Sequence, residues 1–286
     1  MSSTIKEALQ RASFCLQRAG CGNPVGEAAA LLAASLGVTR AWLYAHGEEK
    51  PEAAELQHYF AWVARRADGE PYAYLTGEKE FMSLSFLVTP AVLIPRPETE
   101  LLVETAVREL KGRENLRILD LGTGSGAVAI SIAVLLPESE VVAVDISPAA
   151  LHVATQNAAR HGVTNRVRFL AGDLYAPVCG ERFDAIVSNP PYISSTDIET
   201  LERDVKDFEP RLALSGGPDG LNFYRRLTAE LALLAAPPAL LLFEVGYRQS
   251  EAVAALCYAA GYKNISQLND LAGIPRIILA KPAGTA

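Results

Sequence analysis

The clearest candidate for chemistry is the segment Asn189–Tyr192, whose sequence is Asn-Pro-Pro-Tyr. It follows the apolar run 183–188, which has the composition of a buried strand. Two prolines donate no ladder hydrogen bonds and cannot continue a central strand, so they predict a rigid turn at the strand's end. A stiff turn with an exposed tyrosine is the simplest interpretation, but it leaves the asparagine unexplained.

The same segment suits a planar nitrogen as substrate. The Asn189 side-chain carbonyl and a backbone carbonyl of the proline turn can both accept hydrogen bonds from one NH2 group, and Tyr192 can stack on the planar group that carries it. An amide or aryl nitrogen is a weak nucleophile, so alignment with a methyl donor supplies much of the catalysis, with effective molarities of roughly 10⁵–10⁸ M. The expected substrate-binding residues are Asn189, Pro190, Pro191 and Tyr192, and the expected catalytic residues are Asn189, Pro190 and Tyr192.

A glycine-rich loop provides a second candidate site, for a nucleoside ligand. Residues 120–126 read Asp-Leu-Gly-Thr-Gly-Ser-Gly, between a strand-like and a helix-like run. Glycines allow a tight turn and let a ligand lie against bare backbone. The loop lacks the Gly-Lys-Ser/Thr ending of a triphosphate-binding loop. By itself it does not distinguish NAD from S-adenosylmethionine.

Acidic residues follow the successive predicted strands. Asp145 lies 23 residues after Gly122, a spacing typical of a carboxylate that binds ribose hydroxyls, although it could instead cap the next helix. Asp120 suits a methionine amino group or serves as a structural carboxylate bonded to the loop amides. Asp173 and Leu174 come where an adenine would lie. The expected cofactor-binding residues are Gly122, Thr123, Gly124, Ser125, Gly126, Asp145, Asp173, Leu174 and Asn189.

The elements that position these residues alternate between strands and helices. The predicted strands are 116–121, 140–146, 166–170, 183–188 and 239–245, with a C-terminal pair near 263–268 and 275–280, and the clearest helices between them are 128–135 and 148–160. This alternation predicts a mostly parallel sheet covered by helices on both faces. Ligands of such sheets bind beyond the carboxyl ends of the strands, where the strand order reverses.

The first part of the chain has a helical period instead. Apolar residues recur at helix spacing in 5–16 and 56–63, while 28–36 is apolar nearly all round. We therefore assign residues 1–78 to a helical bundle for substrate docking, although the pattern equally allows a stabilising cap. Residues 79–94 are predicted to form a β-hairpin linker with a turn at Thr89–Pro90, and residues 95–286 the catalytic domain.

Charge and cysteine content limit the classes of partner. The net charge is −7, and the first 90 residues carry 8 basic and 10 acidic side chains against 18 and 23 in the remainder. Neither part is basic, which argues against a nucleic-acid substrate. The four cysteines lack metal-ligand spacing, and we find no signal peptide and no apolar run long enough to span a bilayer. We expect a cytoplasmic monomer without a metal, which binds neither nucleic acid nor membrane.

Several segments resemble the release factor glutamine methyltransferase family of the HemK/PrmC type. The run Ile94–Glu100 is the most specific, whereas Asn-Pro-Pro-Tyr also occurs in DNA adenine and some RNA guanine methyltransferases. The chain departs from the family at Met82-Ser83, where an aromatic-Gly pair is expected, and at Leu174, where an aromatic residue is common. The resemblance covers Gly69–Pro71, Tyr74–Glu78, Phe81, Val92–Glu100, Asp120–Gly126 and Val187–Ile193.

The resemblance implies a class I S-adenosylmethionine-dependent methyltransferase fold, which is Rossmann-like with a mostly parallel seven-stranded sheet, and a small N-terminal helical bundle. It implies that S-adenosylmethionine donates a methyl group, leaving S-adenosylhomocysteine. The acceptor would be the amide nitrogen of glutamine in the Gly-Gly-Gln motif of class 1 peptide chain release factors, proteins of translation termination. It also adds Glu98 and Thr99 to the cofactor-binding residues, with capping of the following helix as the alternative. Glu244 is expected to be structural.

Three alternatives stay open. A DNA adenine or RNA guanine amino-methyltransferase would share Asn-Pro-Pro-Tyr but should carry a basic recognition region. An NAD-dependent oxidoreductase would share the glycine loop but leaves Asn189–Tyr192 unexplained. A non-catalytic binding protein would be expected to have lost the asparagine or the glycines, and both are present.

Overall fold

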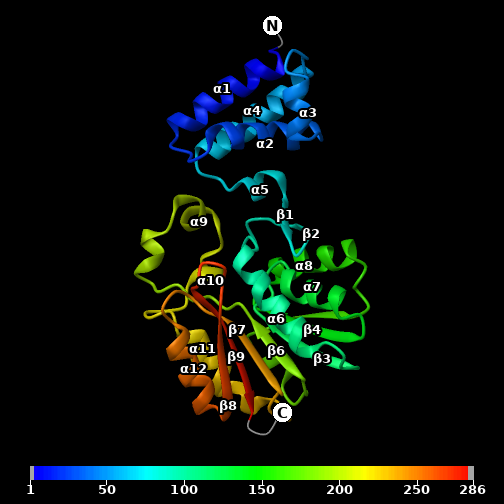
Figure 1. Ribbon diagram of the computed structural model, residues 1–286, viewed down its shortest axis with the longest axis vertical. Helices are drawn as coiled ribbons and strands as arrows, with labels where there is room; N and C mark the ends of the chain where they lie inside the picture. The colour runs from blue at the N-terminus through cyan, green and yellow to red at the C-terminus, as the bar shows by residue number, and fades with distance from the viewer. Residues whose placement is uncertain (1–2, 283–286) are drawn as a thin grey trace. The chain divides into compact units, whose positions relative to one another are not determined.

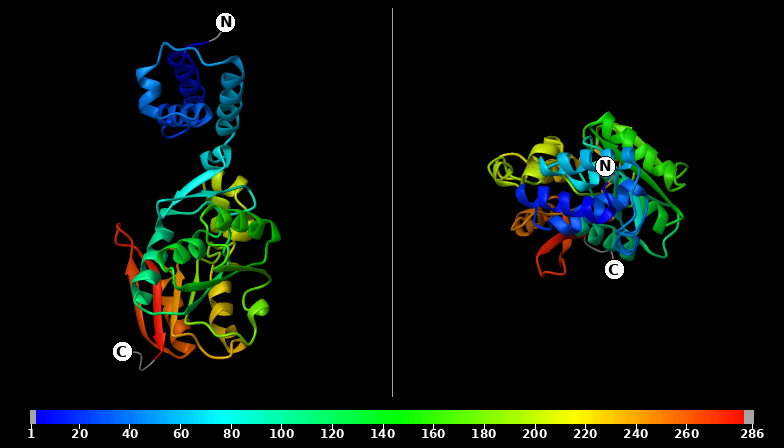
Figure 2. Two further views of the ribbon diagram at one scale, coloured as in Figure 1. Left: turned by 90° about the vertical axis from the view of Figure 1, so that its right-hand side faces the viewer. Right: turned by 90° about the horizontal axis from the view of Figure 1, so that it is seen from above.

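The computed structural model describes residues 3–282 and divides into two compact units, which Figures 1 and 2 show in three views. The first unit comprises the chain through Glu78 together with Glu202–Phe208. The second comprises Lys79–Leu201 and the chain from Glu209 onward. Each unit has its own hydrophobic core and is described separately.

The first unit is a bundle of helices that sequence-encoded caps delimit. Thr4 closes a capping box before the first helix, and Asn23 and Gly37 bound the second, with Pro24 at its first position. The second helix is apolar nearly all round because it packs against both the first and the fourth. The helices are α1 Ile5–Arg18, α2 Pro24–Leu36, α3 Arg40–Ala45, α4 Ala53–Ala67 and α5 Tyr72–Thr76, to which α9 Arg203–Phe208 is added.

The second unit is built on a seven-stranded sheet with the order β5-β4-β3-β6-β7-β9-β8, in which only β9 runs antiparallel to its neighbours. The predicted mostly parallel seven-stranded sheet is confirmed. The strands are β3 Leu116–Leu121, β4 Ser139–Asp145, β5 Val167–Ala171, β6 Ala185–Ser188, β7 Leu240–Glu244, β8 Tyr262–Asn269 and β9 Pro275–Pro282.

Helices cover both faces of this sheet, as the alternation of strands and helices predicts (Figure 1). Side chains along β3 alternate between the two cores, with Ile118 in one and Leu119 in the other. One face carries α6 Glu100–Leu110, α7 Ala127–Leu135 and α8 Pro148–Arg160, and the other carries α11 Asn222–Ala229 and α12 Ser250–Ala259. The remaining short elements are α10 Arg211–Leu214 and the 3₁₀ turns η1 Pro97–Thr99, η2 Ala176–Val178, η3 Asp197–Thr200 and η4 Glu230–Leu233.

The strand order reverses between β3 and β6. The chain passes outward from β3 to β4 and β5 and then returns to place β6 on the other side of β3. The loop after β3 and the turn after β6 therefore lie next to each other at the carboxyl edge of the sheet. The hydroxyl of Ser188 donates to the Leu121 carbonyl oxygen over 2.7 Å and holds these two strand ends together.

The hairpin before the sheet turns at a different place from the one that the sequence indicates. Strands β1 Glu78–Phe81 and β2 Leu84–Leu87 are joined through Met82 and Ser83, whose φ angles are +52° and +59°. Thr89–Pro90 instead opens a separate turn that Val92 N closes onto Thr89 O over 3.0 Å. Left-handed two-residue turns normally use Asn-Gly or Asp-Gly, so the Met-Ser pair gave no turn signal.

Within residues 3–282 no helix is both long and apolar enough to cross a membrane. The same residues contain no group of three or more His, Cys, Asp or Glu side chains that could hold a metal ion.

Candidate active site

A cavity of about 230 Å³ lies at the carboxyl ends of β3, β4, β5 and β6. Gly122 and Gly124 line it from the loop after β3, and Asn189 and Pro191 from the turn after β6. Sequence segments more than 60 residues apart meet here because β3 and β6 are neighbours. The other predicted residues that line the cavity are Asp145, Asp173 and Leu174.

Two glycines of the loop lie in different surroundings. Gly124 has φ +56°, and a β-carbon added there would meet no atom within 4 Å, so its bare backbone faces open space. Gly126 has φ +80°, but an added β-carbon would lie 2.8 Å from Ile130 Cδ1 and 3.1 Å from Ala154 Cβ. Gly124 therefore leaves room for a ligand against the backbone, whereas Gly126 permits close packing around the start of α7.

Asp145 ends β4 at the cavity wall. Its Oδ2 accepts a hydrogen bond from Gly124 N over 2.8 Å and its Oδ1 accepts one from Ser147 N over 2.9 Å. Each carboxylate oxygen can accept a further bond, which leaves capacity for two ribose hydroxyls. The helix cap is Ser147, whose hydroxyl accepts from Ala150 N over 3.2 Å. Burial raises the pKa of Asp145.

Asp120 lies beneath the glycine loop instead of in the cavity wall. Its side chain is 1% exposed and accepts a hydrogen bond from the Thr123 hydroxyl over 2.7 Å. Burial raises its pKa to about 7, against an opposing effect of the hydrogen bonds from Thr123 and the Ala129 backbone. These contacts are those of a structural carboxylate that shapes the loop. Ser125 is also buried, and its carbonyl oxygen accepts from Asn157 Nδ2 over 2.9 Å.

Asp173 and Leu174 border the cavity after β5. The two Asp173 carboxylate oxygens accept from Arg226 Nη1 and Nη2 over 2.9 and 3.0 Å, a bidentate pair with α11. Leu174 has φ +46°, a left-handed conformation that is unfavourable for a branched side chain. Its side chain is buried in the core on the α11 face and offers the cavity apolar contact.

The Asn189–Tyr192 turn is held by contacts on several sides. Asn189 Nδ2 donates to Thr99 Oγ1 over 3.0 Å. The Tyr192 hydroxyl lies 3.4 Å from Glu244 Oε1, while the Tyr192 carbonyl oxygen accepts from Gln249 Nε2 over 2.9 Å. Burial raises the pKa of Tyr192 well above its ordinary value, so the phenol stays protonated. The turn is therefore fixed by its prolines and by side-chain hydrogen bonds.

Glu98 and Thr99, which the family resemblance adds to the cofactor site, do not line the cavity. Glu98 is exposed, whereas Thr99 is 4% exposed and lies against Asn189. Thr99 is the N-terminal cap residue of α6, but its side chain makes no capping hydrogen bond.

The sequence missed part of the cavity wall. The segment 91–93 lines it directly before the Ile94–Glu100 run, and several residues of the region after β6 complete it: Pro210, Leu212, Ala213, Phe223 and Arg226. Residues 91–93 are irregular and α10 has only four residues, so neither segment carries a periodic signal. The only sequence signal for Arg226 was a basic side chain in a short helix to which no role had been assigned.

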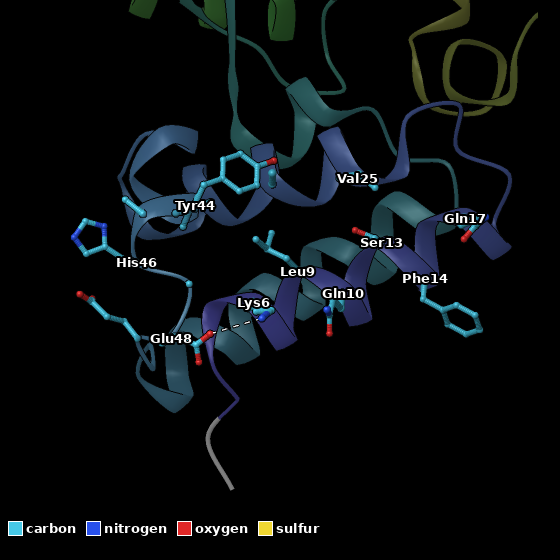
Figure 3. Close-up of a pocket in the computed structure, with 15 residues that line it drawn as sticks. Lys6, Leu9, Gln10, Ser13, Phe14, Gln17, Val25, Tyr44, His46 and Glu48 are labelled. Carbon is cyan, nitrogen blue, oxygen red and sulfur yellow. Dashed lines mark ion pairs between the residues drawn. The ribbon is translucent and has the colours of Figure 1, made fainter.

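A larger opening lies in the first unit, where a groove of about 960 Å³ runs between α1 and the α2–α3 region (Figure 3). Its labelled side chains include Leu9 and Phe14 of α1 and Tyr44 of α3, with Lys6 and Glu48 paired at 3.8 Å. It contains no glycine-rich turn and no inward-facing carboxylate held by backbone amides. The smaller cavity in the second unit is therefore the candidate active site.

Two family models match the chain. Residues 7–77 match the PrmC N-terminal domain, and residues 97–216 match the methyltransferase small domain.

Curated relatives match over nearly the whole chain. The release factor glutamine methyltransferase of Moorella thermoacetica is 47% identical over 97% of this chain and 98% of its own. The enzyme of the same name from Bordetella pertussis is 48% identical over 90% of this chain and 94% of its own. The corresponding protein of Coxiella burnetii is 41% identical over 97% and 99%.

Solved structures share the fold at low identity. A methyltransferase from Pyrococcus furiosus has a TM-score of 0.52 at 18% identity, covering 71% of this chain and 91% of that one. The human methyltransferase 10 domain containing protein has a TM-score of 0.51 at 16% identity, covering 70% and 88%. These neighbours support the fold of the second unit.

Proposed function

Since the chain belongs to the release factor glutamine methyltransferase family, we propose that it methylates the glutamine amide nitrogen in the Gly-Gly-Gln motif of class 1 peptide chain release factors. The donor is S-adenosylmethionine, which supplies an electrophilic methyl group on its sulfonium and leaves as S-adenosylhomocysteine. The matched methyltransferase domain and the sequence relatives support this donor.

One observation carries the proposal. Asn189 borders the same cavity as Gly122 and Gly124, and its Nδ2 is already engaged with Thr99 Oγ1. The remaining polar atom, Oδ1, is therefore the one that can accept a hydrogen bond from a substrate NH2 group. A site that presents an acceptor beside a glycine-lined cavity fits methyl transfer to an amide nitrogen.

The cofactor-binding residues proposed are those that line the cavity. Asp145 accepts hydrogen bonds from the ribose hydroxyls, while the bare backbone at Gly122 and Gly124 lets the ligand approach closely. Asp173 and Leu174 hold the adenine by a polar and an apolar contact. Thr123, Ser125 and Gly126 act indirectly by shaping the loop.

The acceptor residues proposed are Asn189, Pro190, Pro191 and Tyr192. Buried Pro190 and the contacts of Tyr192 fix the turn before substrate arrives, so little ordering is required at each turnover. As the new nitrogen–carbon bond forms, the methyl–sulfur bond breaks, and the nitrogen then releases its extra proton to water. Asn189 Oδ1 accepts a hydrogen bond from one N–H of the substrate amide throughout the reaction, which directs the nitrogen lone pair at the methyl group.

The helical first unit is proposed to dock the release factor. Its matched family model and the exposed side chains Phe14, Val25 and Tyr44 along the α1–α3 groove support this role. A stabilising cap would not require large apolar side chains at the surface.

The test is methyl transfer from labelled S-adenosylmethionine to a purified release factor. We expect label in the wild-type factor and none in a factor whose motif glutamine is changed to asparagine, because the shorter side chain does not reach the acceptor. Adenine-containing duplex DNA serves as the competing substrate. Equal labelling of both factors, or labelling of DNA alone, contradicts the proposal.

A further inference from the structure

We infer that Glu244 is a positioning residue, which acts through the Thr99 hydroxyl to decide which atom of the Asn189 side chain faces the cavity. This inference rests on the proposed function. It assigns a catalytic purpose to a buried carboxyl group that the sequence alone suggests is structural.

The sheet register brings Glu244 to the site. Strands β6 and β7 pair in parallel with Ser188 opposite Phe243, so the next residues of the two strands are Asn189 and Glu244. Thr99 reaches the same place from the 3₁₀ turn before α6, and its Oγ1 accepts a hydrogen bond from Asn189 Nδ2 over 3.0 Å. The three side chains thus come from three separate segments that the fold brings together.

The Glu244 carboxyl group is enclosed and incompletely bonded. It is 2% exposed, and its Oε1 lies 3.4 Å from the Tyr192 hydroxyl. Its Oε2 is buried without a hydrogen-bonding partner of normal geometry among residues 3–282. A buried, incompletely satisfied carboxyl group is unfavourable for folding, so a purely structural role leaves it unexplained.

Hydrogen-bond polarity explains how this group orients the asparagine. The Thr99 hydroxyl is the neighbour that most favours the ionised form of Glu244, although no hydrogen bond of normal geometry joins the two groups. Because an ionised carboxylate only accepts hydrogen bonds, the hydroxyl proton turns toward Glu244. The Thr99 oxygen then has only lone pairs left for Asn189, which must present Nδ2 to it. Oδ1 is consequently turned toward the substrate. The reversed amide would present an NH2 group to the substrate NH2 group, and neither could accept.

The groups around Glu244 shift its pKa in both directions. Burial raises its pKa to about 7, whereas the Thr99 hydroxyl and Arg276 favour the ionised form. Glu98 opposes ionisation, and the Tyr192 hydroxyl favours it. A protonated Glu244 could donate to the Thr99 oxygen and free the threonine proton for Asn189 Oδ1. The orientation of the asparagine therefore follows the ionisation of Glu244.

The decisive variants change Thr99. Thr99→Val keeps the shape but removes the oxygen, and we expect kcat for release factor methylation to fall about 10²-fold because the amide is no longer oriented. Thr99→Ser restores the hydroxyl and should stay within about threefold of wild type, a change that corresponds to less than one ordinary hydrogen bond. Glu244→Gln should lower kcat by an intermediate factor, since an amide can either donate to or accept from Thr99.

A matched control exists on α6. Thr105 is fully buried, and its hydroxyl also lacks a hydrogen-bonding partner within residues 3–282, but it does not line the cavity. Thr105→Val should leave kcat unchanged. The dissociation constant for S-adenosylhomocysteine, measured by calorimetry, should stay within about twofold of wild type in all four variants, because none of these residues lines the cavity.

The outcomes separate the two proposals. A wild-type enzyme that transfers no methyl group to the release factor contradicts the proposed function. If the wild-type enzyme is active and Thr99→Val is unimpaired, the positioning role alone is overturned. The same holds if Thr99→Ser is impaired as much as the valine variant. If circular dichroism shows that Thr99→Val is unfolded, Glu244→Gln decides: unchanged kcat and an unchanged pH profile overturn the inference.

Discussion

The two sides of the cavity are formed by different kinds of chemical group. On the loop side, backbone and partly exposed carboxylates form the wall, as at Gly124 and Asp145. On the turn side, Asn189 is supported by the buried side chains of Thr99 and Glu244 and by the partly buried Tyr192. The loop side is suited to accept a whole ligand, whereas the turn side is suited to hold one atom. Substitutions on the first should change affinity, and substitutions on the second should change the rate of transfer.

The largest effect is expected for Asn189→Ala on the turn side. Removing the acceptor should lower kcat about 10²–10³-fold, as for loss of one preorganised transition-state hydrogen bond. The dissociation constant for S-adenosylhomocysteine, measured by calorimetry, should change little. Weak cofactor binding with normal turnover at saturation would reverse the assignment of the two sides.

Asp145→Ala tests the loop side in the opposite sense. Loss of hydrogen bonds to a charged acceptor should weaken S-adenosylhomocysteine binding about 10- to 100-fold. Turnover at saturating donor should fall much less, because the asparagine and its supports remain. A variant that binds normally but turns over slowly would show that the two sides are not separable.

Within the glycine loop, Gly126→Ala and Gly124→Ala should differ. The first has the same left-handed backbone cost and also adds a β-carbon 3.1 Å from Ala154 Cβ, so it should lower the free energy of unfolding by about 2–3 kcal/mol. The second meets no atom and should cost about 1–2 kcal/mol for its left-handed backbone, together with weaker cofactor binding. Chemical denaturation measures both. Equal destabilisation would mean that packing at Gly126 is not what requires glycine.

The pH dependence should run in opposite directions for turnover and stability. Glu244 has a pKa raised to about 7 by burial, and its ionised form orients Asn189, so kcat should rise as pH increases through about 7. Glu244→Gln should flatten this rise. Asp120 has a pKa raised to about 7 as well. A carboxyl group with a raised pKa stabilises the fold below its unfolded pKa of about 4 and loses that contribution as pH rises through the folded value.

The free energy of unfolding should therefore decrease between about pH 4 and pH 7, the interval between the unfolded and folded pKa values of these two groups. Denaturation at a series of pH values measures it. Asp120→Asn should weaken this decrease without changing the pH dependence of kcat. A stability that increases through this range would contradict the burial argument for both groups.

The smallest effect is expected outside both sides of the cavity, at the hairpin turn. Ser83 has φ +59°, so Ser83→Gly should raise the free energy of unfolding by about 0.5–1 kcal/mol. Thermal unfolding detects the change. Turnover and cofactor affinity should stay at wild-type values, which makes this variant a reference for stability changes without functional cost. A loss of turnover would extend the functional site to the hairpin.

The sequence by itself determined the order of strands and helices, because alternating apolar runs, cap residues and proline turns are local signals. It also indicated the two candidate segments, Gly122–Gly126 and Asn189–Tyr192, and the family resemblance that the relatives confirm. The hairpin turn at Met82–Ser83 was not predicted because neither residue prefers the left-handed backbone that the turn imposes.

Only the tertiary structure decided which side chains contact these two segments. Asp120 proved to lie beneath the loop, Ser147 to cap α8, and Arg226 to pair with Asp173 across 53 residues. The contact between Thr99 and Asn189 spans 90 residues, and Glu244 joins them through the pairing of β6 with β7. Such contacts depend on strand order and register, which are properties of the packed core and leave no local pattern in the chain.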